Sequence, residues 1–131
     1  MITREAAEQL TVGEVMLSRP KTLPPHATVA DLRRLFENEG VRTALLVDGG
    51  RFFGTVERDD LPDAAADGEP AQAFARFDAE LVGPDVLVRD VIPQLERSRE
   101  GRLVVVAEDG TTLRGLLCRR GVDDSFCSGG T

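Results

Sequence analysis

The residues of this sequence best suited to chemistry are carboxylates in two adjacent pairs, Asp59-Asp60 and Asp123-Asp124. Two neighbouring carboxylates can act as general acid and general base when their pKa values are pushed apart. Neither pair has a nucleophile or a set of metal ligands near it in the sequence. Adjacent residues on a short helix also point in different directions, and acidic side chains favour the first turn of a helix. We therefore expect a charge bias at helix N-termini, no catalytic residue and no enzyme activity.

The remaining reactive side chains are one histidine, His26, in a Pro-Pro-His-Ala loop, and two cysteines, Cys118 and Cys127. Soft ligands are too few for a zinc site, so no metal site is expected. Cys118 precedes Arg119 and Arg120, which can lower the pKa of a thiol and favour oxidant sensing. Alternatively, Cys118 is a small buried hydrophobic residue at the end of a strand. Two cysteines are more typical of a reducing cytoplasm than of a disulfide scaffold.

The elements that must position these residues begin with a helix and a hairpin. Thr28 and Asp31 have the spacing of a capping box, and an apolar face follows at helical spacing. Two apolar segments, Thr43–Val47 and Phe52–Val56, then flank Asp48-Gly49-Gly50. Glycine adopts positive φ at little cost, so this pattern predicts a β-hairpin.

The same series returns in the second half of the chain. Val88 lies 59 positions after Val29 (88 − 29), whereas Gly115 lies 61 positions after Gly54 (115 − 54), because the second turn is two residues longer. An offset that changes once, inside a turn, is typical of a duplicated unit. In the second copy, Pro93 is expected to kink or shorten the helix.

This duplication predicts an α+β fold of two βαββα repeats, packed sheet-to-sheet with pseudo-two-fold symmetry and with helices outside. Such an arrangement leaves clefts between the copies that suit a small ligand. We expect a first repeat with an N-terminal helix in 1–66, a second repeat in 77–126 and a disordered tail in 127–131. Residues Asp63–Gln72 are small and acidic and are interrupted by Gly and Pro, which predicts a linker, with bounds set at 67–76.

Composition limits the partners and the location. The 131 residues carry a net charge of −7, which disfavours nucleic acid and anionic membranes as partners. No apolar run approaches the ~18 residues that span a bilayer. The N-terminal sequence contains acids and lacks an apolar core, so a secretion signal is not expected. These features favour a cytoplasmic location without membrane binding.

The segments RPKTL, ATVADLRRLF and VRTALLVD, followed by FFGTVERDDL, resemble a CBS domain. From Val12 to about Asp124, the chain resembles a tandem CBS pair, or Bateman module, of the stand-alone type. The resemblance implies a regulatory module without catalysis. It also implies an adenosine-type ligand such as AMP, ADP, ATP or S-adenosylmethionine in the cleft between the repeats. No cofactor is expected apart from such a regulatory nucleotide.

The family's binding element, Gly-h-h-Thr/Ser-x-x-Asp, corresponds to the segment from Gly54 to Asp60. The resemblance implies that Asp60 accepts hydrogen bonds from both ribose hydroxyls. Glu57 stands where the family has a hydroxyl residue, and a carboxylate beside a phosphate is unfavourable. Arg58 is expected to compensate by binding phosphate through its guanidinium.

The second copy of this element has lost both functional side chains, since Cys118 and Gly121 occupy the two positions. One site is therefore expected to be half-intact and the other degraded. The resemblance implies an apolar adenine slot in the first copy, and each of its candidates also has an ordinary role in the core or at a strand edge. These candidates are Thr22, Leu23, Arg42, Thr43, Ala44 and Val56.

Two hypotheses about function follow. In the first, ligand binding near Asp60 shifts the packing of the repeats, and an unidentified protein partner recognises the shift. In the second, nucleotide binding has been lost, and the chain is a structural or stress-associated interaction module. A homodimer is expected in either case, because the predicted helices Val29–Asn38 and Val88–Arg99 have a high apolar content.

Overall fold

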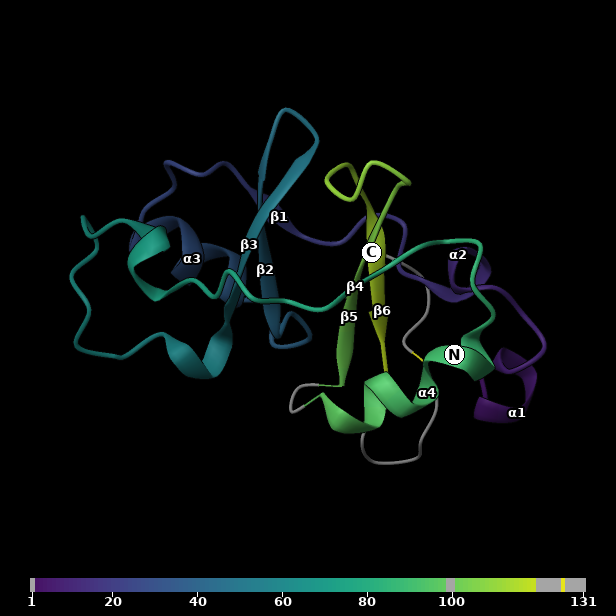
Figure 1. The fold of residues 1–131 in the computed structure, drawn as a ribbon. Coiled ribbons are helices and arrows are strands. Elements are labelled where there is room, and N and C mark those ends of the chain that lie inside the picture. The colour runs from purple at the N-terminus through teal and green to yellow at the C-terminus, as the bar shows by residue number, and fades with distance from the viewer. Residues whose placement is uncertain (1, 99–100, 120–125, 127–131) are drawn as a thin grey trace. The chain divides into compact units, whose positions relative to one another are not determined.

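The computed structural model describes residues 2–98, 101–119 and 126. By their contacts, the residues form two compact units, each considered by itself here. The central unit comprises Lys21–Ala79, and the terminal unit combines Met1–Pro20 with Glu80–Thr131. Figure 1 shows the elements of both units in chain order. The predicted tail, 127–131, lies outside the described residues.

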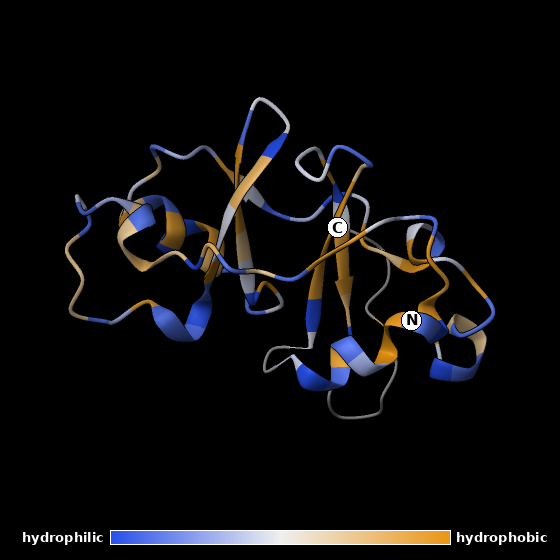
Figure 2. Ribbon diagram, viewed as in Figure 1, coloured by the Kyte–Doolittle hydropathy of each residue, from blue (hydrophilic) through white to orange (hydrophobic). Residues whose placement is uncertain are grey.

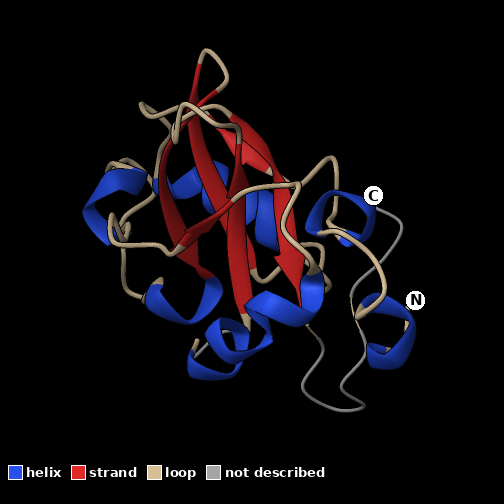
Figure 3. Ribbon diagram, turned by 45° about the vertical axis from the view of Figure 1, so that its right-hand side comes forward, coloured by secondary structure: helices blue, strands red, loops and turns tan. Residues whose placement is uncertain are grey.

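Each unit contains one three-stranded sheet, and the expected α+β class is confirmed (Figure 3). In the central unit, the first strand pairs parallel to the second and the second antiparallel to the third. The terminal unit repeats this order. The central elements are β1 (Thr22–Leu23), α3 (Val29–Phe36), β2 (Thr43–Asp48), β3 (Arg51–Glu57), and the 3₁₀ turns η1 (Arg58–Asp60) and η2 (Ala71–Phe74). The terminal elements are α1 (Arg4–Ala7), α2 (Val12–Val15), β4 (Leu81–Val82), α4 (Val88–Arg97), β5 (Arg102–Val106) and β6 (Leu113–Cys118).

The predicted capping box is present at the start of α3, and a second one begins α2. At α3, the backbone N–H of Thr28 donates to the Asp31 carboxylate at 3.0 Å, and this hydrogen bond lowers the pKa of Asp31. At α2, Thr11 and Glu14 form a reciprocal capping box. The backbone N–H of Thr11 is the main cause of the lowered pKa of Glu14. The second helix, α4, runs through Pro93 and is not shortened there, since it has ten residues where α3 has eight.

The two hairpins close as the sequence predicts, through glycines with positive φ. Gly49 and Gly50 have φ of 57° and 88° between β2 and β3. In the longer turn between β5 and β6, Gly110 has φ of 75°. Hydrogen bonds from the Thr112 side chain and from the backbone N–H groups of Thr112 and Thr111 strongly lower the pKa of Asp109 in this turn. The two extra residues are therefore accommodated without breaking the ladder.

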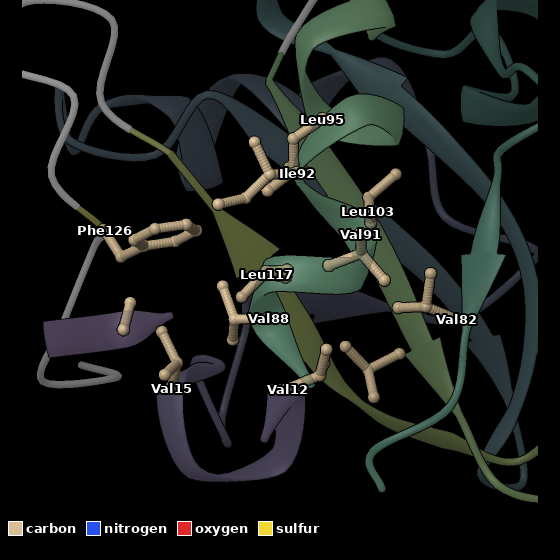
Figure 4. Close-up of a cluster of buried hydrophobic side chains, with 12 residues drawn as sticks. Val12, Val15, Val82, Val88, Val91, Ile92, Leu95, Leu103, Leu117 and Phe126 are labelled. Carbon is tan, nitrogen blue, oxygen red and sulfur yellow. The ribbon is translucent and has the colours of Figure 1, made fainter. Parts of the chain in front are cut away.

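Each unit has an apolar core of its own. In the central unit, the core lies between α3 and one face of the sheet, where Leu32, Ala44 and Val56 are fully buried. In the terminal unit, Val12 and Val15 of α2 join side chains from α4, the strands and Phe126 (Figure 4). Figure 2 shows that β5 and β6 are largely apolar, whereas α4 carries both apolar and hydrophilic residues.

Each unit is completed by the segment that precedes the other repeat in the sequence. In the terminal unit, the backbone N–H of Val88, at the start of α4, donates to the carbonyl of Leu10 at 2.9 Å. In the central unit, the N–H of Val29, at the start of α3, donates to the carbonyl of Glu69 at 2.8 Å. The two donor residues lie 59 positions apart (88 − 29), and so do the two acceptor residues (69 − 10). The duplication therefore extends into the predicted linker. That stretch has structure of its own, whereas the proposed domain boundaries stay a prediction.

Candidate functional site

The central unit holds every residue of the first predicted site. Asp60, the predicted ribose ligand, lies in η1 directly after β3 and is half-buried. Its carboxylate accepts two hydrogen bonds from one guanidinium. Arg76 Nε donates to Oδ2 at 2.6 Å, and Arg76 Nη2 donates to Oδ1 at 3.1 Å. The carboxylate is therefore oriented to bind two parallel donors at once.

Arg76 was not among the predicted site residues, and backbone pairing places it there. Its N–H donates to the carbonyl of Thr55 at 2.7 Å, and the N–H of Thr55 donates back to the Arg76 carbonyl at 3.0 Å. Gly54 permits this approach, because a Cβ at Gly54 would lie 3.0 Å from both the Arg76 carbonyl oxygen and the Phe77 ring. A composition-based interpretation of 67–76 as a linker gave no signal for this contact.

Arg58, predicted to bind phosphate, is engaged with backbone carbonyls in the structure. Its Nη2 lies 2.8 Å from the carbonyl oxygens of Phe36 and Asn38 and 2.7 Å from that of Val41. The guanidinium also lies over the Phe36 ring, 5.0 Å from its centroid. Phe36 is the last residue of α3, where a cation is favoured by the helix dipole, and the other two carbonyls lie in the segment after the helix. Arg58 therefore caps α3 and holds the segment that follows it, and its contact with a phosphate stays a prediction.

Glu57, at the position where the resemblance implies a hydroxyl residue, is buried with 9% of its surface exposed. The hydroxyl of Thr43 lies 2.9 Å and 2.8 Å from its two carboxylate oxygens. Thr43 and Glu57 face each other across β2 and β3, so the contact is a cross-strand pair. Two predicted site residues thus contact each other directly in the central unit.

The other predicted residues line the sheet. Ala44 and Val56 are cross-strand partners and fully buried in the central core. Thr22 and Leu23 form β1, where Thr22 is exposed and Leu23 packs against the same core. Arg42 is exposed and lies before β2. Its guanidinium is 3.5 Å from the Asp59 carboxylate.

Two hollows open on the central unit beside this site. One, of about 370 Å³, has Lys21, Leu23 and Arg34 in its lining. The other, of about 320 Å³, is lined in part by Phe36, Arg58 and Leu61. Two predicted site residues therefore line these hollows, Leu23 the first and Arg58 the second.

The two neighbouring acids of η1 have separate partners: Asp59 pairs with Arg42, and Asp60 pairs with Arg76. The two carboxylates are therefore not arranged as a general acid and a general base for one proton transfer. His26 is exposed. Among the residues that the structure describes, no three His, Cys, Asp or Glu side chains gather as a metal site. In the same ranges, no helix is long and apolar enough to cross a membrane.

The second copy of the binding element is described only as far as Arg119, so Gly121, Asp123 and Asp124 lie outside the described residues. Cys118, at the end of β6, is half-buried and disulfide-bonded. Both interpretations of a free Cys118, as an oxidant sensor and as a buried hydrophobic residue, are therefore wrong for this structure. The sequence predicts no disulfide, because two cysteines are more typical of a reducing cytoplasm. The other cysteine, Cys127, lies outside the described residues.

Comparison with known proteins gives this geometry a family context. Residues 12–67 match the CBS domain family. The uncharacterised protein MJ1232 of Methanocaldococcus jannaschii is 22% identical over 111 residues, and the match covers 84% of this chain. The chain spans only 37% of that relative.

Solved structures share the fold along most of the chain. A putative acetoin utilization protein (AcuB) from Vibrio cholerae is 26% identical, with a TM-score of 0.72 and 82% of both chains covered. The CBS-pair protein CBSX2 from Arabidopsis thaliana is 22% identical, with a TM-score of 0.73 and coverage of 83% of this chain and 88% of that one. CBSX2 has also been solved in complex with AMP, and that structure is 23% identical with a TM-score of 0.73, covering 84% of this chain and 90% of that one.

Proposed function

Since this chain is a tandem CBS-domain protein, we propose that it is a regulatory module without catalytic activity that binds an adenosine-type ligand in its central unit. Asp60 accepts hydrogen bonds from both ribose hydroxyls, and binding changes the packing that a protein partner recognises. AMP, ADP, ATP and S-adenosylmethionine are the candidate ligands. The AMP complex of CBSX2 supports this ligand class.

The observation that carries the proposal is the geometry of the Asp60 carboxylate. Its two oxygens already accept two parallel N–H donors from Arg76, at 2.6 and 3.1 Å. The vicinal hydroxyls of a ribose present two donors in a similar side-by-side arrangement, so the same carboxylate can accept them. Asp60 is also accessible, because about a third of its side chain is exposed.

The adenine slot is proposed along β1 and β2, next to Asp60 in the same unit. Leu23 supplies apolar surface, Ala44 and Val56 are fully buried and support the slot from the core, and the backbone of Arg42 and Thr43 supplies polar groups for the base edge. Thr22 is exposed and completes this set. Such a combination of apolar walls and few polar groups is usual for small-ligand sites.

A thermal-shift screen with an extrinsic dye tests the proposal, since the chain has no Trp or Tyr. At 100 times its Kd, a ligand stabilises the folded protein by about 2.7 kcal/mol, which raises the Tm by roughly 10 °C for a chain of this size. Asp60→Ala is expected to abolish the shift. Asp59→Ala is the matched control and should keep it, because the Asp59 side chain is 82% exposed and its ion pair with Arg42 is long, at 3.5 Å.

The alternative, an interaction module that has lost nucleotide binding, is favoured by one observation. Arg58 is held by the carbonyls at the end of α3 and by the Phe36 ring, as a structural residue would be. A screen without any shift at millimolar ligand, on protein that unfolds cooperatively, would favour this second function. The search would then turn to protein partners.

We further propose that the chain forms a homodimer and acts in the cytoplasm. Sedimentation at tens of micromolar should give twice the chain mass of 14.2 kDa, and a 14.2 kDa species would contradict the dimer. Cell fractionation tests the location. The disulfide at Cys118 makes this a worthwhile test, because disulfides are uncommon in the cytosol.

A further inference from the structure

Arg76 and Asp60 form an ion pair with two contacts in the central unit. The two N–H···O contacts are parallel, and each side chain is only about one-third exposed, 33% for Arg76 and 32% for Asp60. Paired contacts of this kind hold both side chains in one orientation and resist screening better than a single exposed contact. The carboxylate that the proposed function assigns to ribose is thus occupied by the chain itself.

The backbone keeps the guanidinium in place. Arg76 exchanges two hydrogen bonds with Thr55 of β3, at 2.7 and 3.0 Å, only five residues before Asp60 in sequence. Phe77 follows directly and packs edge-on against Phe53, with ring centroids 5.6 Å apart at 87°. These contacts order the segment that carries Arg76 and hold its side chain beside Asp60, at a high effective concentration.

The terminal unit shows that this segment does not need the ion pair to cross its sheet. Leu17, the residue 59 positions before Arg76, makes the same backbone exchange with Leu116 of β6, at 2.8 and 3.0 Å. The position equivalent to Asp60 in the second repeat is Gly121 (60 + 61). In sequence, neither member of the pair has a counterpart at the equivalent positions of the terminal unit, Leu17 and Gly121, where the binding element is degraded. The Arg76–Asp60 pair belongs with the binding element and is not a requirement of the fold.

We propose that Arg76 is a built-in competitor for the ligand site, which holds Asp60 and is displaced when ribose hydroxyls take its place. This inference rests on the proposed function and adds its regulation. Ligand affinity is reduced by the fraction of molecules in which Arg76 occupies the carboxylate. Binding separates Arg76 from Asp60 and loosens the pairing of its segment with β3, so the signal passes into the segment that joins the two repeats.

Calorimetric titration with adenosine and with AMP tests the competition in the wild type, in Arg76→Gln and in the control Arg51→Gln. Arg51 begins β3, at the opposite end of the strand from Asp60, and is exposed. Removing a competing ion pair of this exposure should tighten binding by about fivefold for both probes. Arg51→Gln should match the wild type with adenosine.

Other results would overturn the competition. Equal or weaker binding of adenosine by Arg76→Gln would do so while the proposed function stood. Weaker binding of AMP alone would make Arg76 a phosphate ligand instead of a competitor. If none of the three proteins bound either probe, the proposed function and the competition would both fail.

A ligand-free measurement covers the case in which Arg76→Gln alters folding. Hydrogen exchange at the backbone amides of Thr55 and Arg76 reports the pairing between this segment and β3. Asp60→Asn removes the charged partner and should speed exchange at both amides by about fivefold. Asp59→Asn is the control and should leave them unchanged. Unchanged exchange in Asp60→Asn would show that Arg76 does not couple the site to the segment.

Discussion

Replacing Gly115 with alanine tests the pairing of the N-terminal segment with β6 in the terminal unit. An added Cβ at this position would lie 2.5 Å from the carbonyl oxygen of Leu17 and 2.6 Å from the sulfur of Met16. The Met16 side chain can rotate away, but the carbonyl belongs to backbone that is hydrogen-bonded to Leu116. The Leu17 segment must therefore move away from the sheet.

The cost follows from the contacts that this movement disturbs. Two backbone hydrogen bonds between Leu17 and Leu116, at 2.8 and 3.0 Å, contribute about 1 kcal/mol each. Displacing packed atoms adds about 1 kcal/mol, and the reduced entropy of the unfolded chain returns about 0.7 kcal/mol. The net destabilisation is about 2 kcal/mol, which lowers the Tm by roughly 7 °C.

Differential scanning fluorimetry and urea unfolding measure this effect. Gly54→Ala should be milder, near 1 kcal/mol, because its Cβ would lie 3.0 Å from the Arg76 carbonyl oxygen. Gly68→Ala is the control and should be neutral, since no heavy atom lies within 4 Å of its Cβ position. A Gly115→Ala protein as stable as the wild type would refute the close approach of this segment to β6.

Three further predictions concern capping and packing. Arg58→Gln should destabilise by about 2 kcal/mol in urea unfolding, since carbonyls at the end of α3 lose a charged donor. Asp31→Asn should lower the Tm at neutral pH. Its pKa is lowered by the Thr28 N–H, so the wild-type advantage is present above the unfolded pKa and should vanish as the pH falls through the folded pKa. Leu117→Ala should cost about 3 kcal/mol in the same unfolding assay, because this side chain is fully buried.

Controls separate these effects from general ones. Arg34→Gln removes the same charge from an exposed position and should stay within 0.5 kcal/mol of wild type. Equal stability of Arg58→Gln would contradict the capping role. A constant difference between Asp31→Asn and wild type from pH 7 to pH 2 would contradict the linkage. Wild-type stability of Leu117→Ala would contradict its place in the core.

The sequence predicted the parts of the fold that depend on local patterns. Capping by Thr28 and Asp31 and the turn glycine Gly49 follow from residue types at short spacing, and the structure contains both. The offset that steps from 59 to 61 also predicted two similar strand–helix–hairpin units. These features are visible in a sequence because side chains a few residues apart determine them.

The crossing segments could not be predicted in this way. Residues 69–76 take the place in the central unit that 10–17 take in the terminal unit, yet the two sequences, EPAQAFAR and LTVGEVML, share no identical position. Their common contacts are backbone hydrogen bonds, which impose little on side-chain identity. The apolar pairs Val12 and Ala71, and Val15 and Phe74, which pack in the two cores, carry a trace of the equivalence.

The sequence named the candidate site residues, which stay a prediction, but not the partners that the structure gives them. Asp60 follows β3 as the motif implies, whereas its partner Arg76 lies 16 residues away in a segment without a recognisable motif. Arg58 contacts α3 because the chain returns beside the end of that helix, which no local pattern encodes. Both contacts join segments that are far apart in the sequence and meet only in the folded chain.

Titration of ¹⁵N-labelled protein with AMP, followed by amide chemical shifts, is the most direct test of the central claim that an adenosine ligand binds at Asp60. The account predicts saturable changes at Thr22, Leu23 and 54–60, and at Arg76 as it leaves the carboxylate. The equivalent strand residues 115–118 should change little. Saturable changes confined to 115–118, or none at millimolar AMP, would contradict the claim.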